Sequence, residues 1–240
     1  MISFSTNRLV FIGEVDLIQG QTEILIDNQV CYRFCVYLAN AANRLASFIM
    51  KHLLSAIIQD VYPISRTSQS KIEEQLEVQE FQKNDLIFRS GAPNYKEYFI
   101  LSGVCRSFLL NPLGEESTLS FYTSNTVVAP NISRVRTGHS ILNLQALTPL
   151  TVASINTVVF NELRLGNSEI LNFAHTVLQN ELLKKVDKEI GLAALTASDR
   201  LEQFREDYPM LENLIPHSYI ASYLGITNIS LSRLRSRKGN

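Results

Sequence analysis

Residues 217 to 236 read HSYIASYLGITNISLSRLRS, and their small, glycine and apolar positions decide the fold of the C-terminal part of the chain. Two helices that cross closely need a small residue at the crossing, which Ala221 supplies, and the tight turn between them needs a residue that tolerates positive φ, which Gly225 supplies. Pro216 precedes the first helix, where proline is accepted, and Thr227 can cap the second helix through its hydroxyl. The stretch therefore predicts a helix-turn-helix.

Apolar and polar positions separate on these two predicted helices. The residues expected to face the shared core are Ile220, Leu224, Ile226, Leu231 and Leu234. The side chains expected to point outward are Asn228, Ser230, Ser232, Arg233, Arg235 and Arg237. Short polar groups and guanidinium forks of this kind reach base edges and phosphates in a major groove. With Thr227, these six residues are the candidate contacts to double-stranded DNA.

Charge is also sorted along this end of the chain. Residues 227–240 contain three arginines and Lys238 but no acidic residue, whereas the preceding predicted helix contains Asp199, Glu202, Glu206 and Asp207. The whole chain has a net charge of −1, so DNA affinity has to come from this local patch, duplicated by dimerisation. The alternative reading is an ordinary helical hairpin with a solvated basic end.

Composition places the chain among ordinary globular proteins. Its 240 residues are 45% hydrophobic and 19% charged, with room for two domains. No apolar run reaches the ~18 to 20 residues that span a bilayer, and no signal peptide is recognisable, so we expect a cytoplasmic protein without membrane contact. The three cysteines, Cys31, Cys35 and Cys105, cannot all pair and are expected to be reduced packing residues, with no metal or other cofactor.

Residues 1–49 form an N-terminal extension of unclear role, in which Val30, Tyr32, Phe34, Val36 and Leu38 alternate as a strand would. The pattern becomes helical at Met50, and SKIEEQLE predicts a second short helix behind Ser70. The extension is either a lineage-specific addition or the product of a start site placed too far upstream. The intact mass of the native protein distinguishes the two.

From about Glu77 to Phe160, short apolar runs alternate with turn signals such as KND, SGAPN and NPLGEE. This spacing predicts a small antiparallel barrel or jelly roll, with Gly91, Gly103 and Gly114 at its junctions. Residues 50–166 are therefore assigned to one β-rich domain, and the fold class expected for the whole chain is α+β.

A long helix is expected from Asn167, across residues 167–194. Its apolar stripe consists of Ile170, Phe173, Ala174, Val177, Leu178, Leu182, Val186 and Ile190. The stripe predicts a dimerisation helix, or alternatively a helix packed on its own barrel. Thr196 and Asp199 resemble a capping box that opens the next helix, which Pro209 ends, so residues 195–240 form the helix-turn-helix DNA-binding domain.

The stretches FQKNDLIFRSGAPNYKEYFILSGVCRSFLLNPLGEES and IASYLGITNISLSRLR resemble the opening barrel strands and the DNA-binding end of the Crp/Fnr family of bacterial transcription regulators. The resemblance covers roughly residues 50 to 240 and is closest to the Bacteroidetes-type form, which ends soon after the recognition helix. It implies a cyclic-nucleotide-binding-like barrel, a dimerisation helix and a C-terminal helix-turn-helix. It also implies a homodimer that regulates transcription, with DNA, RNA polymerase and a small-molecule effector as partners.

The family's base-reading residues carry over in part. Its main base-reading arginine falls on Arg233, and the adjacent serine of the fumarate-nitrate type falls on Ser232. Members commonly carry an acid where this chain has Ile229, preceded by Asn228. Ile229 cannot accept a hydrogen bond and offers only an apolar contact, for example to a thymine methyl. We therefore expect an operator that differs from the family's best-known sites.

The sensor departs further from the resemblance. Cyclic-nucleotide-binding members use a carboxylate for the ribose, but no Asp or Glu lies between Glu116 and Glu162, and Arg134 and Arg136 do not sit in the expected arginine motif. We expect a degenerate or differently tuned sensor that does not bind cyclic AMP. Cys31 and Cys35 lack the number and spacing for an iron–sulfur cluster. The lone histidines His52, His139 and His175 give no reason to expect haem.

Two other classes of function compete with the regulator. A metal-dependent enzyme built on the barrel needs clustered histidines and a carboxylate, but the four histidines, His52, His139, His175 and His217, are scattered over three segments, so we expect no enzyme. The other class is a ligand-binding or protein-docking module of the same fold that has lost DNA binding. Ile229 suggests this class, because it stands where family members commonly carry an acid. Salt-dependent DNA affinity separates this class from the regulator.

Overall fold

The computed structural model describes residues 4–5, 8–9, 48–111, 114–128 and 138–237, and the side chains as far as 236. The chain divides into two compact units, Met1–Leu45 and Ala46–Asn240. In the first unit, β1 (Phe4–Ser5) pairs with β2 (Arg8–Leu9) in antiparallel fashion. The predicted strand at 30–38, Cys31, Cys35, Arg134 and Arg136 lie outside the described residues.

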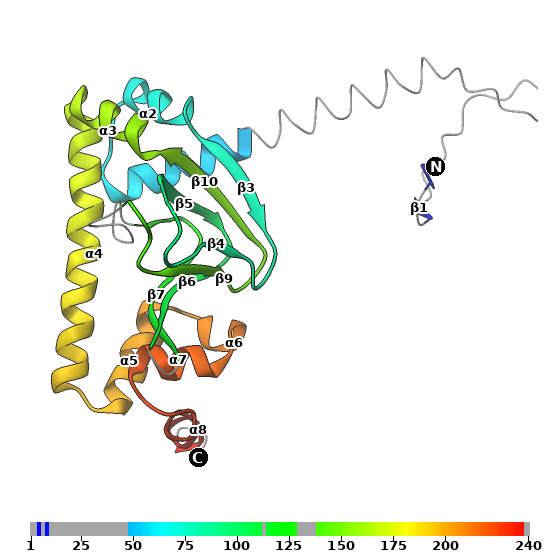
Figure 1. Ribbon diagram of the computed structural model, residues 1–240, viewed down its shortest axis with the longest axis vertical. Helices are drawn as coiled ribbons and strands as arrows, with labels where there is room; N and C mark the ends of the chain where they lie inside the picture. Colours follow the sequence, from blue (N-terminus) through cyan, green and yellow to red (C-terminus); the bar gives the residue numbers. More distant parts are fainter. Residues whose placement is uncertain (1–3, 6–7, 10–47, 112–113, 129–137, 238–240) are drawn as a thin grey trace, which may run out of the picture. The chain divides into compact units, whose positions relative to one another are not determined.

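The strands of the second unit form two four-stranded antiparallel sheets, with the orders β3-β10-β5-β8 and β4-β9-β6-β7 (Figure 1). Their bounds are Glu77–Phe81 (β3), Leu86–Phe88 (β4), Lys96–Ser102 (β5), Cys105–Leu110 (β6), Glu116–Tyr122 (β7), Thr126–Val128 (β8), Asn143–Ala146 (β9) and Leu150–Asn156 (β10). The antiparallel β fold predicted from the turn spacing is confirmed.

An apolar cluster with residues from both sheets fills the interior of the β domain. Its buried members are Phe88, Tyr98, Ile100, Cys105, Tyr122, Val128, Leu144, Ala146, Leu150 and Val152. Burial raises the pKa of the Cys105 thiol, so this cysteine stays protonated and acts as a small apolar side chain. The structure agrees with its expected role as a packing residue.

Gly103, between β5 and β6, occupies a position that no other residue fits. Its φ is +92°, and a Cβ there would lie 2.3 Å from the carbonyl oxygen of Pro149. Gly91 and Gly114 also have positive φ, as expected for residues at the junctions between strands.

Three helical segments pack on the side of the β domain formed by β5 and β10. They are residues 48–61, α2 (Arg66–Glu73) and α3 (Thr157–Leu165), and they share a core with Phe99 and Ile155. The helix expected behind Ser70 in fact begins at Arg66. Ser65 supplies the missed N-cap, because its Oγ accepts a hydrogen bond from the Ser68 amide at 3.3 Å.

The long helix α4 (Ser168–Ala194) begins after Asn167, whose side chain accepts hydrogen bonds from the amides of Glu169 and Ile170. The first half of its apolar stripe, Ile170, Phe173, Ala174 and Val177, is buried on the β domain. The second half, Leu178, Leu182, Val186 and Ile190, is exposed, with 64% of Leu182 accessible. Packing on the β domain therefore accounts for the first half of the stripe, and the dimerisation reading of the second half stays a prediction.

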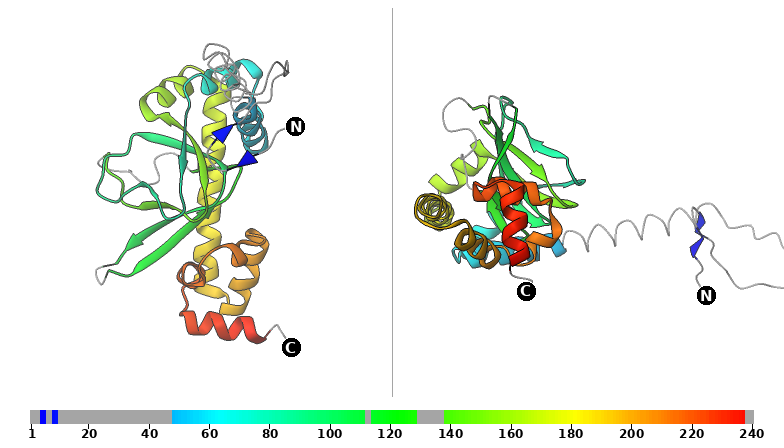
Figure 2. Two further views of the ribbon diagram at one scale, coloured as in Figure 1. Left: turned by 90° about the vertical axis from the view of Figure 1, so that its right-hand side faces the viewer. Right: turned by 90° about the horizontal axis from the view of Figure 1, so that it is seen from below.

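Four helices follow α4 (Figures 1 and 2). They are α5 (Ala197–Asp207), α6 (Leu211–Leu214), α7 (His217–Leu224) and α8 (Asn228–Arg237). The capping box of Thr196 and Asp199 is present, as predicted, and α5 ends just before Pro209. The short helix α6 was not predicted; it begins behind Met210, which has a φ of +68°.

Candidate nucleic-acid interface

The turn between α7 and α8 requires glycine for two reasons. Gly225 has a φ of +67°, and a Cβ there would lie 3.0 Å from Cδ2 of Leu192 in α4. The amide of Ile226 donates to the carbonyl oxygen of Ala221 at 3.0 Å, which closes the turn. The local geometry expected from the sequence is thus present, and α4 packs against it.

The core of the C-terminal helices holds α7 and α8 together. Its buried members from these helices are Ile220, Ala221, Leu224 and Leu231. Ile226 and Leu234 are half-buried against the same cluster. All five apolar positions expected to face inward do so, which fixes the face of α8 that remains outside.

Thr227 caps α8. The Ser230 amide donates to Thr227 Oγ1 at 3.1 Å, and the two hydroxyl groups lie 3.0 Å apart. Ser230 is half-buried, whereas Thr227 is exposed. Within the described structure both hydroxyls thus act locally, although each was expected to contact DNA.

The outer face of α8 exposes three of the candidate contacts, Asn228, Ser232 and Arg233, and it also exposes Ile229. The accessible fraction of Ile229 is 66%. No hydrogen bond or ion pair holds the Arg233 guanidinium among the described residues. In the view from below in Figure 2, α8 (red) lies in front of the other C-terminal helices. These side chains are therefore accessible to a bound macromolecule.

Arg235 differs from the expectation that it points outward. Its Nε forms a 2.7 Å ion pair with Glu212 Oε1, and its Nη1 lies 3.1 Å from Nδ1 of His217. Arg205 of α5 binds the same carboxylate through Nε at 2.7 Å and Nη2 at 3.1 Å. Glu212 therefore ties α8 to α5, a role that sequence reasoning missed because its partners are 7 and 23 residues away.

Replacing Glu212 by Gln should lower the free energy of unfolding by about 1 kcal/mol at pH 7, since charge-assisted hydrogen bonds to partly exposed partners are lost. Hydrogen bonding from Arg205 and the charges of Arg205 and Arg235 lower the pKa of Glu212 below its usual 4.5. Its contribution is therefore present above pH 4.5 and disappears as the pH falls through the folded-state pKa.

Urea unfolding of both proteins at pH 7 and at successively lower pH measures this difference. Glu206→Gln, an exposed change of equal charge on α5, serves as the control and should leave stability nearly unchanged. A difference between wild type and Glu212→Gln that persists unchanged in acid would contradict the role of the ion pair.

A cavity of 180 Å³ lies between the β7 and β8 region of the domain expected to be the sensor and the helices α4, α5 and α7. Polar groups of the protein already meet there: the Tyr122 hydroxyl donates to Glu181 Oε1 at 3.4 Å, and Lys185 binds Glu181 at 3.2 Å and also Ser120. The lining carboxylates belong to Glu181 of α4 and Asp207 of α5. Among the described residues of the β-domain strands, no Asp or Glu lines this cavity.

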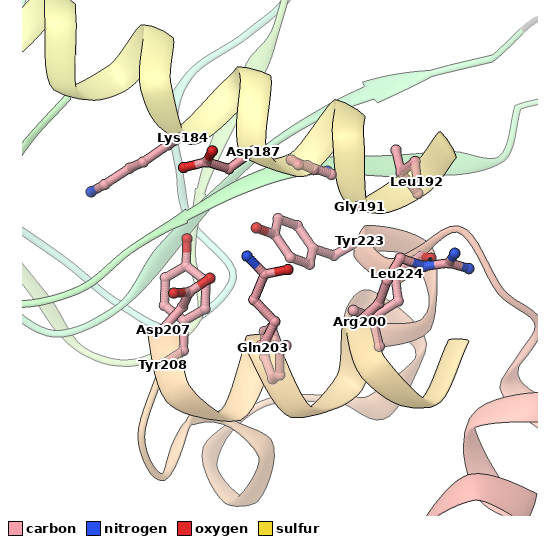
Figure 3. Close-up of a pocket in the computed structure, with 12 residues that line it drawn as sticks. Lys184, Asp187, Gly191, Leu192, Arg200, Gln203, Asp207, Tyr208, Tyr223 and Leu224 are labelled. Atoms are coloured by element: carbon pink, nitrogen blue, oxygen red, sulfur yellow. Dashed lines mark hydrogen bonds between the residues drawn. The ribbon is translucent and has the colours of Figure 1, made fainter. Parts of the chain in front are cut away.

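A second cavity, of 170 Å³, adjoins the first between α4, α5 and α7 (Figure 3). Lys184 and Asp187 come from α4, whereas Gln203 and Asp207 come from α5, so both signs of charge line it. Burial, together with Glu206 and Asp187, raises the pKa of Asp207. This mixed lining is unlike a basic cradle for phosphate groups.

Other kinds of site have no support in the described part of the chain. No group of three or more His, Cys, Asp or Glu side chains there could hold a metal ion. Of the helices in the same residues, none combines the length and the apolar character needed to cross a membrane.

Comparison with known proteins finds one matching family model and several similar solved structures. Residues 78–167 match the family model of the cyclic nucleotide-binding domain. FixK2 of Bradyrhizobium japonicum superposes with a TM-score of 0.59 at 19% identity, covering 68% of this chain and 83% of FixK2. The c-di-GMP-responsive global regulator CLP of Xanthomonas campestris gives 0.59 at 17% identity, covering 73% and 92%.

A putative cAMP-binding regulatory protein from Silicibacter pomeroyi gives a TM-score of 0.54 at 21% identity, covering 78% of this chain and 87% of that protein. A sequence search finds no match among curated proteins. The narrower Bacteroidetes-type resemblance stays a prediction. Residues 78–167 are thus similar to the cyclic nucleotide-binding domain, and the chain has a fold like those of FixK2 and CLP.

Proposed function

We propose that the protein is a homodimeric regulator of transcription that binds specific sequences in double-stranded DNA and whose sensor does not take cyclic AMP. One observation carries this proposal: a helix-turn-helix core whose second helix exposes Asn228, Ile229, Ser232 and Arg233. We expect no catalytic activity. We expect the protein to act in the cytoplasm, with RNA polymerase and an effector of unknown identity as further partners.

The exposed side chains of α8 suit different contacts with DNA. The Arg233 fork suits bidentate contact with guanine O6 and N7, and Ile229 suits a thymine methyl. Ser232 and Asn228 are short enough to reach base edges or phosphates beside them. Arg235 and Arg237 were expected to hold phosphates, and Arg235 has to leave Glu212 to do so.

The exposed second half of the α4 stripe supports the homodimer. Leu178, Leu182, Val186 and Ile190 recur every fourth residue, and a second copy of α4 would cover them. Such a pair of subunits places two α8 helices about one DNA turn apart, ~34 Å, and this predicts an inverted-repeat operator.

Replacing Leu182 by Glu should convert dimers to monomers, because a charge at the centre of an apolar helix pair cannot be solvated there. Sedimentation velocity of the purified variant measures the change. Leu165→Glu, on α3, alters a residue that is 81% exposed and should leave the dimer intact. Dimers of unchanged affinity in Leu182→Glu would place the interface elsewhere.

Cyclic AMP at millimolar concentration should leave the melting temperature unchanged. If it did bind, a concentration of 100 times its Kd would stabilise the folded state by about 2.7 kcal/mol, an effect large enough to detect. The physical reason is that no Asp or Glu lies between Glu116 and Glu162 to accept hydrogen bonds from the ribose. Differential scanning fluorimetry with cyclic AMP, and with AMP as the control, measures this. A specific upward shift would contradict the prediction.

The proposal as a whole is tested by selecting bound sequences from random duplex DNA with the purified full chain and no ligand. Recovery of an inverted repeat supports the dimeric regulator. A second readout is the salt dependence of affinity for the recovered site, which should fall steeply with salt as phosphate contacts release counterions. A folded dimer that recovers no sequence, even at low salt where phosphate contacts are strongest, indicates the alternative. That alternative is a ligand-binding or docking module that has lost DNA binding.

A further inference from the structure

Arg106 of β6 is a fully buried arginine, with none of its surface accessible. Its Nε and Nη2 donate to Gln145 Oε1 at 3.0 and 2.8 Å, its Nη1 donates to Thr118 Oγ1 at 3.1 Å, and Nη2 also pairs with Glu116. Burying a guanidinium costs several kcal/mol unless its donors are satisfied. Here β7 and β9, the neighbours of β6 in its sheet, satisfy them.

Two aromatic rings cover the Arg106 guanidinium. The ring of Phe108, in the same strand, lies 4.3 Å from Cζ, and the ring of Tyr219, in α7, lies 3.4 Å from it. The hydrogen-bond partners all belong to the β domain, so they remain if α7 moves. Tyr219 is thus the contact that α7 adds to a desolvated cation, a cation–π interaction of the stronger kind.

Ser222, one turn further along α7, binds the backbone of β7, which is the edge strand of its sheet. The Thr118 amide donates to Ser222 Oγ at 2.9 Å, and Ser222 Oγ donates to the Glu116 carbonyl at 3.0 Å. Lys188 of α4 donates to the Thr118 and Leu119 carbonyls at 3.3 and 2.9 Å. An edge strand presents such groups in a fixed row, so this contact specifies where α7 lies along β7.

The contact leaves the reading face of α8 open, because Ile229 and Arg233 are exposed while Tyr219 and Ser222 are engaged. It therefore orients α8 without covering it. The chain passes from α4 to α5 through Leu195 and Thr196, which have extended backbone, and Leu192 of α4 also lies against Gly225.

We propose that Arg106, Tyr219 and Ser222 are positioning residues for DNA reading: they hold α7 on the edge of the sheet and so set the distance between the two α8 helices of the dimer. The inference rests on the proposed function. It assigns the choice of half-site spacing to the contact between the β domain and α7, in addition to the α4 pair.

The test uses the full chain and a library in which two copies of the selected half-site, inverted, are separated by spacers of varied length. Tyr219→Leu removes the ring, and Tyr219→Phe is its matched control because it keeps the ring. Ser222→Ala removes both backbone hydrogen bonds, and Ser218→Ala, an exposed serine on the same helix, is its control. Arg106→Gln probes the other side of the contact.

We expect wild type, Tyr219→Phe and Ser218→Ala to favour one spacer, and Tyr219→Leu and Ser222→Ala to lose at least about tenfold of that preference. The preferred half-site sequence should stay the same. A general loss of folding would abolish that preference as well, so the two effects can be separated. Arg106→Gln should behave like Tyr219→Leu if it folds, as judged by its circular dichroism; the two α7 variants decide the matter if it does not.

An unchanged spacer preference in folded Tyr219→Leu and Ser222→Ala would overturn the inference and leave the proposed function standing. Failure of the wild type to select any half-site would instead overturn the proposed function. The two failures are therefore distinguishable.

Discussion

Replacing Arg233 by Ala is expected to weaken operator binding by about 1–3 kcal/mol per half-site, roughly 5- to 150-fold, with the factors of the two half-sites multiplying. The reason is the loss of the two parallel hydrogen bonds that the Arg233 guanidinium is proposed to donate to a guanine edge. Arg233 is exposed on α8, and its side chain has no hydrogen-bond or ion-pair partner among the described residues. Its replacement should therefore leave folding unaffected. Fluorescence anisotropy with the selected site and with its scrambled version measures both affinity and specificity.

Two controls separate base reading from charge. Arg233→Lys keeps the charge but not the planar fork, so it should retain the salt-dependent affinity for scrambled DNA and lose discrimination. Arg89→Ala removes an exposed charge of the same sign from the β domain and should bind as wild type does. If Arg233→Ala bound both DNAs unchanged, another residue of α8 would have to read the bases.

Replacing Phe204 by Ala is expected to lower the free energy of unfolding by about 3–5 kcal/mol, the usual cost of deleting a buried aromatic side chain. Phe204 is 1% exposed, and its ring lies 5.9 Å from that of Phe121, 5.3 Å from Tyr208 and 5.8 Å from Tyr223, between ring centroids. Phe121 belongs to β7, so the lost contacts include those that join the C-terminal helices to the sheet.

Urea unfolding followed by circular dichroism measures this cost. Leu165→Ala, on the exposed face of α3, should change stability by less than about 0.5 kcal/mol and serves as the control. Phe204→Leu should lie between wild type and Phe204→Ala, because it fills more of the cavity. Equal stability of Phe204→Ala and Leu165→Ala would show that the aromatic cluster does not support the domain.

Local rules predicted the parts of the site that depend on neighbours in the chain. Gly225, the inward face of α7 and α8, and the Thr196 capping box follow from turn and helix chemistry, and each is present. The β runs between Glu77 and Phe160 likewise predicted an antiparallel β domain. The misses are of two kinds: Ser65 was overlooked as a cap, and α6 lacks a periodic signal in its four residues.

Long-range contacts changed the reading of individual side chains. Arg235 looked outward on a helical wheel, but Glu212 holds it, and Thr227 and Ser230 use their hydroxyls on each other. The α4 stripe looked uniform, but its first half packs on Phe99 of β5. The corrections to Arg235 and to the α4 stripe come from partners distant in the sequence, whereas Thr227 and Ser230 are three residues apart and form a local cap.

The sequence by itself determined the order of a β domain, a long helix and two short helices joined by a tight turn, because turn residues, caps and apolar periods act within a few positions of the chain. Only the tertiary structure decided which charges are free and which are engaged. Arg106 and Arg233 are alike in the sequence, yet Arg106 is buried under Tyr219 whereas Arg233 is exposed. The physical reason is that a charge acquires its role from the atoms that desolvate and pair it, and these come from distant segments.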